Sequence, residues 1–88
     1  MKGFLDLSPS FDYQVDPKLS VAAYCEFDIL NVNLKLDRQK KAINVWYYMM
    51  LNDGTKYLNL TLITIEMYYI DLSLICHAGQ IFSMFVLN

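Results

Sequence analysis

Hydrophobic and polar residues alternate with a period of two through the middle of the chain, as expected of half-buried β-strands. The alternation is visible over residues 23–29 and resumes in the opposite phase over residues 30–36. Successive side chains of a strand point to opposite faces, so this change of phase predicts a bulge, a sharp bend or a change of strand near Leu30. The polar residues 38–41 then form a connector to the next strand.

A β-hairpin is the clearest local prediction. The segment Ala42–Leu51 is free of charge and rich in strand formers, and it meets Asp53-Gly54, a pair that suits a two-residue type I′ turn. With these two residues as the loop, Asn52 faces Thr55 and the register is fixed. One face is then apolar and pairs Val45 with Leu62, Tyr47 with Leu60, and Met49 with Leu58. The other face is aromatic and pairs Trp46 with Thr61, Tyr48 with Asn59, and Met50 with Tyr57.

The N-terminal region divides at Asp16-Pro17. Residues 1–16 predict an irregular arm, held to the core by the apolar side chains Phe4, Leu5, Leu7, Phe11 and Tyr13. A capping carboxylate followed by proline predicts the start of a short helix over residues 18–23, and a strand beginning near Val21 is the competing interpretation. Together with a strand-rich core over residues 17–88, the arm makes one domain, residues 1–88.

The chain beyond the hairpin lacks the usual signals for turns, because no glycine or proline occurs between Gly54 and Gly79. We favour a strand ending near Met67 and another over residues 70–76, since β-branched and aromatic residues dominate there. The alternative is a helix over residues 66–77 that Gly79 ends. Residues 81–87 predict a final strand. The expected fold is therefore mainly β, a small antiparallel sheet of four to five strands in a meander with a central hairpin, with room for one short helix.

The segment Gly79-Gln80-Ile81-Phe82-Ser83-Met84, with the strands expected before it, resembles the end of the sheet in SecB-type export chaperones. The resemblance implies that this segment closes a sheet. The long C-terminal helices of that family have no counterpart here, and we transfer no functional residue from it.

The composition predicts that the chain associates with another polypeptide. Apolar residues make up 56% of the sequence, above the roughly 45–50% usual for soluble domains. A domain of this length buries only about 60–65% of the surface of its unfolded chain. We therefore expect a protein partner or self-association into a homo-oligomer. The net charge of −2 gives no broad attraction to nucleic acid or anionic lipid.

Cysteine content and hydropathy predict a cytoplasmic protein. Cys25 and Cys76 form neither a metal-type pair nor a disulfide framework, so we expect free thiols. An acid and a proline interrupt the first residues before the apolar region of a secretory signal develops. Residues 57–76 are long enough to cross a membrane, but Glu66 and Asp71 would each cost roughly 2.5–3.5 kcal/mol there. We expect no membrane association.

No arrangement of residues predicts catalysis, and we expect no enzyme, no cofactor and no metal. Cys76 and His77 are adjacent, but neighbours in a strand point to opposite faces and cannot form a dyad. Cys25 would add a third zinc ligand, one fewer than a structural site needs. Glu66 lies in an apolar run that would raise its pKa, although its parity places it on the solvent face.

Two clusters are candidate binding sites. Trp46, Tyr48, Met50 and Tyr57 share the aromatic face of the hairpin, and Trp and Tyr are typical interface anchors. The alternative is that this face forms a second core layer.

A non-enzymatic protein-binding module is the preferred function: a small inhibitor, adaptor or assembly subunit acting through this face or through an open strand edge. A single-stranded nucleic-acid binder is the alternative, using the basic residues Lys35, Arg38, Lys40 and Lys41. A small-ligand-binding β domain is a further alternative.

Overall fold

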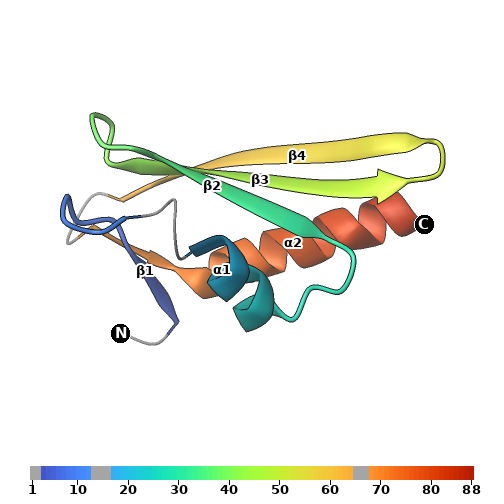
Figure 1. Cartoon of the computed structure of the whole chain (residues 1–88), viewed down its shortest axis with the longest axis horizontal. Helices are drawn as coiled ribbons and strands as arrows, with labels where there is room; N and C mark the ends of the chain where they lie inside the picture. Colours follow the sequence, from blue (N-terminus) through green and yellow to red (C-terminus); the bar gives the residue numbers. More distant parts are fainter. Residues whose placement is uncertain (1–2, 13–16, 65–67) are drawn as a thin grey trace.

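Two antiparallel sheets and two helices make up the part of the chain that the structure describes. The computed structural model describes residues 3–12, 17–64 and 68–88, and residues 17–20 by their backbone only. The elements in order are β1 Phe4–Asp6, α1 Pro17–Cys25, β2 Asn31–Asp37, β3 Ala42–Leu51, β4 Gly54–Ile63, β5 Tyr69–Asp71 and α2 Leu72–Leu87. The sheets have the orders β1-β5 and β2-β3-β4, and the larger one lies above both helices (Figure 1). The fold is mainly β and contains the predicted meander, but the prediction of a single sheet of four to five strands is wrong.

The hairpin of β3 and β4 is confirmed, with a register two residues away from the prediction. Leu51 pairs with Gly54, so that Asn52 and Asp53 form the turn. Neither turn residue has a positive φ, whereas Gly54 has a φ of 126°. Because a type I′ turn needs positive φ at both central residues, the predicted turn is not formed. A shift of two residues leaves every side chain on its predicted face.

The strand that was predicted over residues 23–29 does not form: helix α1 takes up residues 23–25, and residues 26–29 belong to the loop before β2. Of the two interpretations at Pro17, the helix is the one that forms, and it continues to Cys25. Glu26, at a φ of 57°, ends it, while the N–H groups of Glu26 and Phe27 donate to the carbonyls of Ala23 and Ala22, respectively. These bonds form a Schellman motif, which satisfies carbonyls that the last turn leaves free. The phase change near Leu30 marks the start of β2 at Asn31.

Of the two interpretations of residues 66–77, the favoured strand over 70–76 is wrong beyond Asp71. The alternative helix forms from Leu72 onward, but it does not end at Gly79. The strand predicted over residues 81–87 is wrong, because these residues belong to the same helix. The three-residue strand β5 leads directly into α2, a helix of 16 residues. Asp71 caps this helix, because its Oδ1 accepts a hydrogen bond of 2.9 Å from the Ser73 N–H. Helix α2 also contains the segment that resembled a SecB sheet end. Glu66 and Met67 lie outside the described residues.

The N-terminal arm is more regular than expected. Strand β1 pairs with β5, Leu5 opposite Ile70. Leu5 and Leu7 are buried as predicted, and Phe11 packs half-buried against the core. Phe4 instead remains exposed, with its ring centroid 6.5 Å from that of Tyr69. Tyr13 lies outside the described residues.

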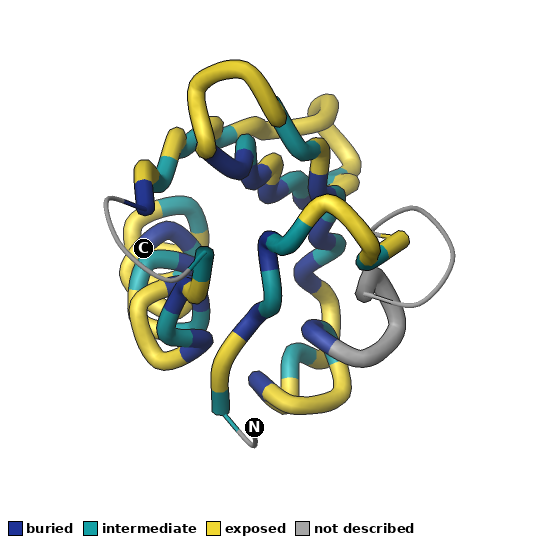
Figure 2. Tube along the Cα trace, turned by 90° about the vertical axis from the view of Figure 1, so that its left-hand side faces the viewer, coloured by how far each residue is buried: buried dark blue, intermediate teal, exposed yellow. Residues whose placement is uncertain are grey.

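The core lies between the inner face of the larger sheet and the two helices. Figure 2 shows the buried segments turned inward around this space. The inward side chains of β3 are fully buried: Ile43, Val45, Tyr47 and Met49. A disulfide joins Cys25 at the end of α1 to Cys76 in the first turns of α2, with the two Cα atoms 5.1 Å apart. The prediction of free thiols is therefore wrong.

Candidate binding surface

Large side chains gather on the solvent face of the larger sheet, where the sequence predicted them. We call Trp46, Tyr48, Met50 and Tyr57 the aromatic face. Trp46, Met50 and Tyr57 are 42%, 71% and 66% exposed, and Tyr48 is half-buried. This face is therefore not a second core layer in the chain by itself.

The shifted register brings two tyrosines of the aromatic face together. Tyr48 of β3 lies directly opposite Tyr57 of β4, with ring centroids 6.2 Å apart and ring planes 30° from parallel. The predicted register had paired Tyr48 with Asn59. An aromatic pair across two strands stabilises the sheet and holds both rings in place.

A shallow hollow of about 320 Å³ lies on this face, lined by Asn33, Trp46, Tyr48 and Tyr57. Asn33 comes from β2, where it pairs with Trp46. Asn33 could not be predicted as a lining residue from the sequence, because its position beside Trp46 depends on the register between β2 and β3. Met50 lies further toward the turn, opposite Thr55, and is not part of the lining.

The hollow is lined by uncharged polar and aromatic groups. Its lining has no carboxylate and no basic side chain, because it consists of an asparagine, a tryptophan and two tyrosines. The indole N–H, the two phenol hydroxyls and the amide supply hydrogen-bond donors and acceptors beside wide apolar ring faces. Rings fixed on a sheet lose little conformational entropy on binding, which makes them effective contact surfaces.

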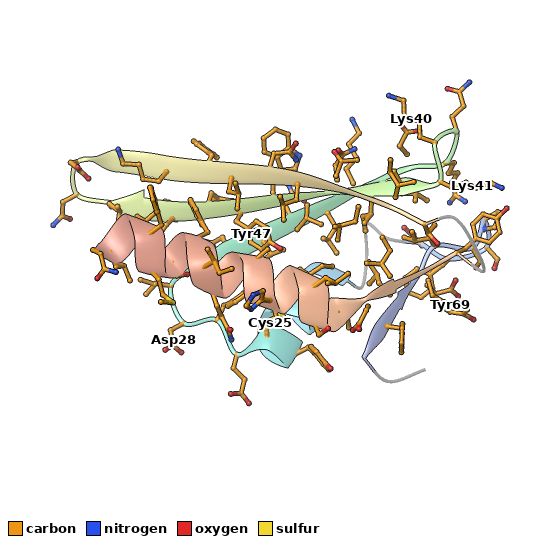
Figure 3. The ribbon with its side chains drawn as sticks, turned by 180° about the vertical axis from the view of Figure 1, so that it is seen from behind. Cys25, Asp28, Lys40, Lys41, Tyr47 and Tyr69 are labelled. Carbon is orange, nitrogen blue, oxygen red and sulfur yellow. A yellow bond between two sulfur atoms is a disulfide. The ribbon has the colours of Figure 1, made fainter. Side chains whose placement is uncertain are left out.

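The basic cluster is partly used inside the molecule. Arg38 Nη1 donates a hydrogen bond of 2.7 Å to the Pro9 carbonyl, so it holds the N-terminal arm. Lys41 Nζ lies 5.0 Å from the ring centroid of Tyr68, within the range of a cation–π interaction. Lys35 and Lys40 are exposed, and Figure 3 shows Lys40 projecting from one end of the molecule. The four residues therefore do not form one free basic surface.

The residues that sequence analysis considered for catalysis do not form a site. Cys25 and Cys76 are bonded to each other, so neither sulfur is a thiolate nucleophile or a metal ligand in this state. His77 is exposed on α2. Glu66 lies outside the described residues.

The buried hydroxyl of Tyr47 has a structural role. It points from β3 toward α2 (Figure 3) and donates a hydrogen bond of 2.7 Å to the Ile75 carbonyl. Burial raises the pKa of Tyr47 above the ordinary value for tyrosine, because a phenolate would lose its hydration there. Tyr47 therefore stays neutral and links the sheet to the helix.

Within the described residues we find no helix whose length and hydropathy would let it cross a bilayer. Comparison of the chain with protein-family models, with curated proteins and with solved structures found no match. We therefore infer the function from the chain's own surface.

Proposed function

We propose that this protein is a non-enzymatic protein-binding module whose aromatic face binds an extended segment of a partner polypeptide. The observation that supports it is a group of large rings around a hollow on the open side of a three-stranded sheet. Exposed apolar groups of this kind in water mark interaction sites, and Trp and Tyr are the residues that most often carry binding energy at interfaces.

The lining indicates the kind of segment that fits. An uncharged aromatic hollow favours apolar side chains, and its donors suit the carbonyls of an extended backbone. A strongly charged segment would lose hydration there without gaining an ion pair. The proposed partner segment is therefore extended, apolar and of low charge.

The test uses Trp46, which is the only tryptophan in the chain and therefore reports on this face. A library of random displayed peptides is selected against the protein, and the enriched peptides are titrated by fluorescence and calorimetry. We expect them to be apolar, to shift the Trp46 emission to shorter wavelength and to protect it from quenching. Tyr57→Ala should weaken binding about tenfold, and Trp46→Ala with Tyr48→Ala about a hundredfold or more.

Ile63→Ala is the matched control for this test. Ile63 is also exposed on β4 and has the same face parity as Tyr57, but it lies six residues away, roughly 20 Å along the strand. Its removal should leave peptide affinity unchanged. The proposal is wrong if no selected peptide changes the Trp46 emission, or if the Tyr57 and Ile63 variants bind equally well.

One observation keeps single-stranded nucleic acid as a second candidate. A hollow of about 430 Å³ that includes Lys35 and Arg38 borders the aromatic face and shares Trp46 with it, so a base could stack where a phosphate is paired. Asp37 also lines this hollow, and Arg38 is already bonded to Pro9, which favours the peptide. Quenching of Trp46 by a single-stranded oligonucleotide, lost steeply with added salt, would favour nucleic acid instead.

Two other expectations stay predictions. A small-ligand site would need a more enclosed space than this hollow, which is open to solvent. The Cys25–Cys76 disulfide argues against a cytoplasmic location, because disulfides persist mainly in oxidising compartments.

A further inference from the structure

An apolar stripe runs along the side of α2 that is turned away from α1. Leu74, Ala78, Ile81 and Phe85 follow at intervals of four, three and four residues, the spacing of a seam that packs against another helix. At 3.6 residues per turn, they lie roughly 140–180° around the axis from Cys76, through which α2 is bonded to α1. Leu74, Ile81 and Phe85 are 56%, 53% and 85% exposed.

The exposed polar side chains of this helix, Ser73, His77 and Gln80, lie together on one side, which the stripe does not include. The segment Leu72–Leu87 contains no aspartate, glutamate, lysine or arginine. Its inner face already packs in the core through Leu72, Ile75 and Phe82. The apolar surface of α2 therefore extends beyond its core face onto the neighbouring stripe, and apolar helix surface is normally covered. The stripe therefore requires a cover that is itself uncharged.

The open edge of β4 lies on the same side of the molecule as the stripe. Seen from behind, α2 is in front of α1, and β4 runs above it (Figure 3). Among the described residues β4 pairs only with β3, so part of its backbone hydrogen-bonding capacity is unused. Lys56 is the only charge in Gly54–Ile63, which has no proline. Charge and proline are the usual devices that keep strand edges apart.

The core is also incomplete at this edge. The inward side chains of β4 are only half-buried (Leu58, Leu60 and Leu62), whereas those of β3 are fully buried. The incomplete core, the open edge and the stripe therefore occur together on the β4 and α2 side.

We propose that a second copy of this chain covers this surface around a two-fold axis. Strand β4 pairs antiparallel with β4 of the second copy, which joins the two larger sheets into one, and the two α2 stripes pack against each other beneath it. A strand edge and an apolar seam are both self-complementary under a two-fold rotation, and the arrangement closes at two copies. This dimer does not depend on the aromatic face.

The size of the surface is sufficient for a dimer. The exposed parts of the stripe, with Met84 beside it and the β4 leucines, amount to about 500 Å² per chain. This uses about 150–250 Å² for a free aromatic side chain such as Phe85 and the lower end of that range for the aliphatic ones. Two copies would bury about 1,000 Å², the least expected of a biological interface, before the paired backbones are counted. A charged heteropartner would find no complementary charge on α2.

The test is the mass of the 88-residue chain in solution, measured by sedimentation equilibrium over a range of concentrations. We expect twice the chain mass of 10.3 kDa. Ile81→Lys with Phe85→Lys should reduce it to one chain mass while the circular dichroism spectrum stays unchanged. Leu87→Lys is the matched control, because Leu87 is equally apolar and exposed on α2 but lies in the hollow beside residues 26–30; this variant should remain a dimer.

Hydrogen exchange tests the strand pairing separately. Amides of β4 should be protected in the dimer and should exchange faster in the Ile81→Lys, Phe85→Lys monomer. A wild-type mass of one chain at every concentration would overturn the proposal. So would a dimer that survives the double substitution, or β4 exchange that is equal in dimer and monomer. Trp46→Ala with Tyr48→Ala should leave the mass at two chains, so failure of the proposed function and failure of the dimer are distinguishable.

Discussion

Gly79 lets α2 approach the sheet. A Cβ atom at this position would lie 2.4 Å from Phe27 Cζ and 3.0 Å from both Leu30 Cδ2 and Tyr47 Cε1. The Tyr47 ring cannot retreat easily, because it is fully buried and its hydroxyl is bonded to Ile75. The sequence suggested that Gly79 ends a helix, whereas in the structure it serves close packing in the middle of one.

We predict that Gly79→Ala destabilises the fold. Alanine is about 1 kcal/mol better than glycine in a helix, but overpacking a tight core typically costs 1–3 kcal/mol. We expect a net loss of about 1 kcal/mol in the free energy of unfolding, measured by urea denaturation. Gln80→Ala, at the exposed neighbouring position, should change stability by less than about 0.5 kcal/mol. A Gly79→Ala variant as stable as the wild type would contradict this account of the packing.

Tyr47 makes stability depend on pH in the alkaline range. The unfolded chain ionises this tyrosine near pH 10, whereas burial raises the pKa of Tyr47 in the folded chain. In the folded state Tyr47 therefore stays protonated to a higher pH than in the unfolded state, and the free energy of unfolding should fall as the pH rises above about 10. Below that pH the contribution of Tyr47 is constant.

We expect Tyr47→Phe to be about 1 kcal/mol less stable than wild type at neutral pH, because the bond to the Ile75 carbonyl is lost. As the pH rises above about 10, the free energy of unfolding of this variant should fall less than that of the wild type. Tyr57→Phe, on the open face, is the control and should keep the wild-type pH dependence. If the free energy of unfolding fell equally with pH in Tyr47→Phe and in the wild type, the buried phenol would not be the cause of that fall.

At the scale of elements, the disulfide is the covalent link between the two helices. Cys25 and Cys76 are 51 residues apart in the chain, so their bond restricts a long loop in the unfolded state. A loop of this length corresponds to a stabilisation of about 4 kcal/mol. That is a large part of the stability of a domain of this size.

We predict that reduction lowers the urea midpoint of the wild type strongly and leaves that of Cys25→Ala with Cys76→Ala unchanged. The double variant should itself be about 2–5 kcal/mol less stable than the oxidised wild type. Alkylation of the unreduced, unfolded protein gives the independent check. Two modified cysteines per chain would mean that the bond does not form.

The elements also show what the sequence could and could not predict. The faces of β3 and β4 were predictable, because alternation depends only on parity and the register error of two residues preserves parity. The turn itself was not predictable in the same way. Asp53-Gly54 suits a type I′ loop, whereas the chain turns at Asn52 and Asp53 without a positive φ and places its positive φ at Gly54, the first residue of β4. Helix α2 was considered only as the alternative over residues 66–77, and its continuation to Leu87 was missed, because apolar residues occupy most positions from Leu72 to Leu87 and obscure a helical period.

The candidate site was predictable in part for the same reason. Parity placed Trp46, Tyr48 and Tyr57 on one outward face, as the structure shows. Asn33 and the Tyr48–Tyr57 ring pair depend on pairing between strands, which one sequence does not specify. The α2 stripe depends on a helix that was expected to be strand.

At the scale of the whole molecule, the surface is larger than a chain of this mass usually exposes. The accessible area is 6169 Å², against about 5,400 Å² for a typical monomer of 10.3 kDa. The molecule is also elongated, with extents of 40 × 24 × 22 Å. A three-stranded sheet over two helices cannot enclose 56% apolar residues. The aromatic face and the α2 stripe carry much of the exposed apolar surface.

The most direct test of the central claim, that the aromatic face binds a polypeptide segment, is a chemical-shift map of the backbone amides during titration with a selected peptide. The account predicts that the perturbed amides centre on Asn33, Trp46, Tyr48 and Tyr57. Perturbations centred on residues 35–41 or on α2, with those four amides unmoved, would contradict it.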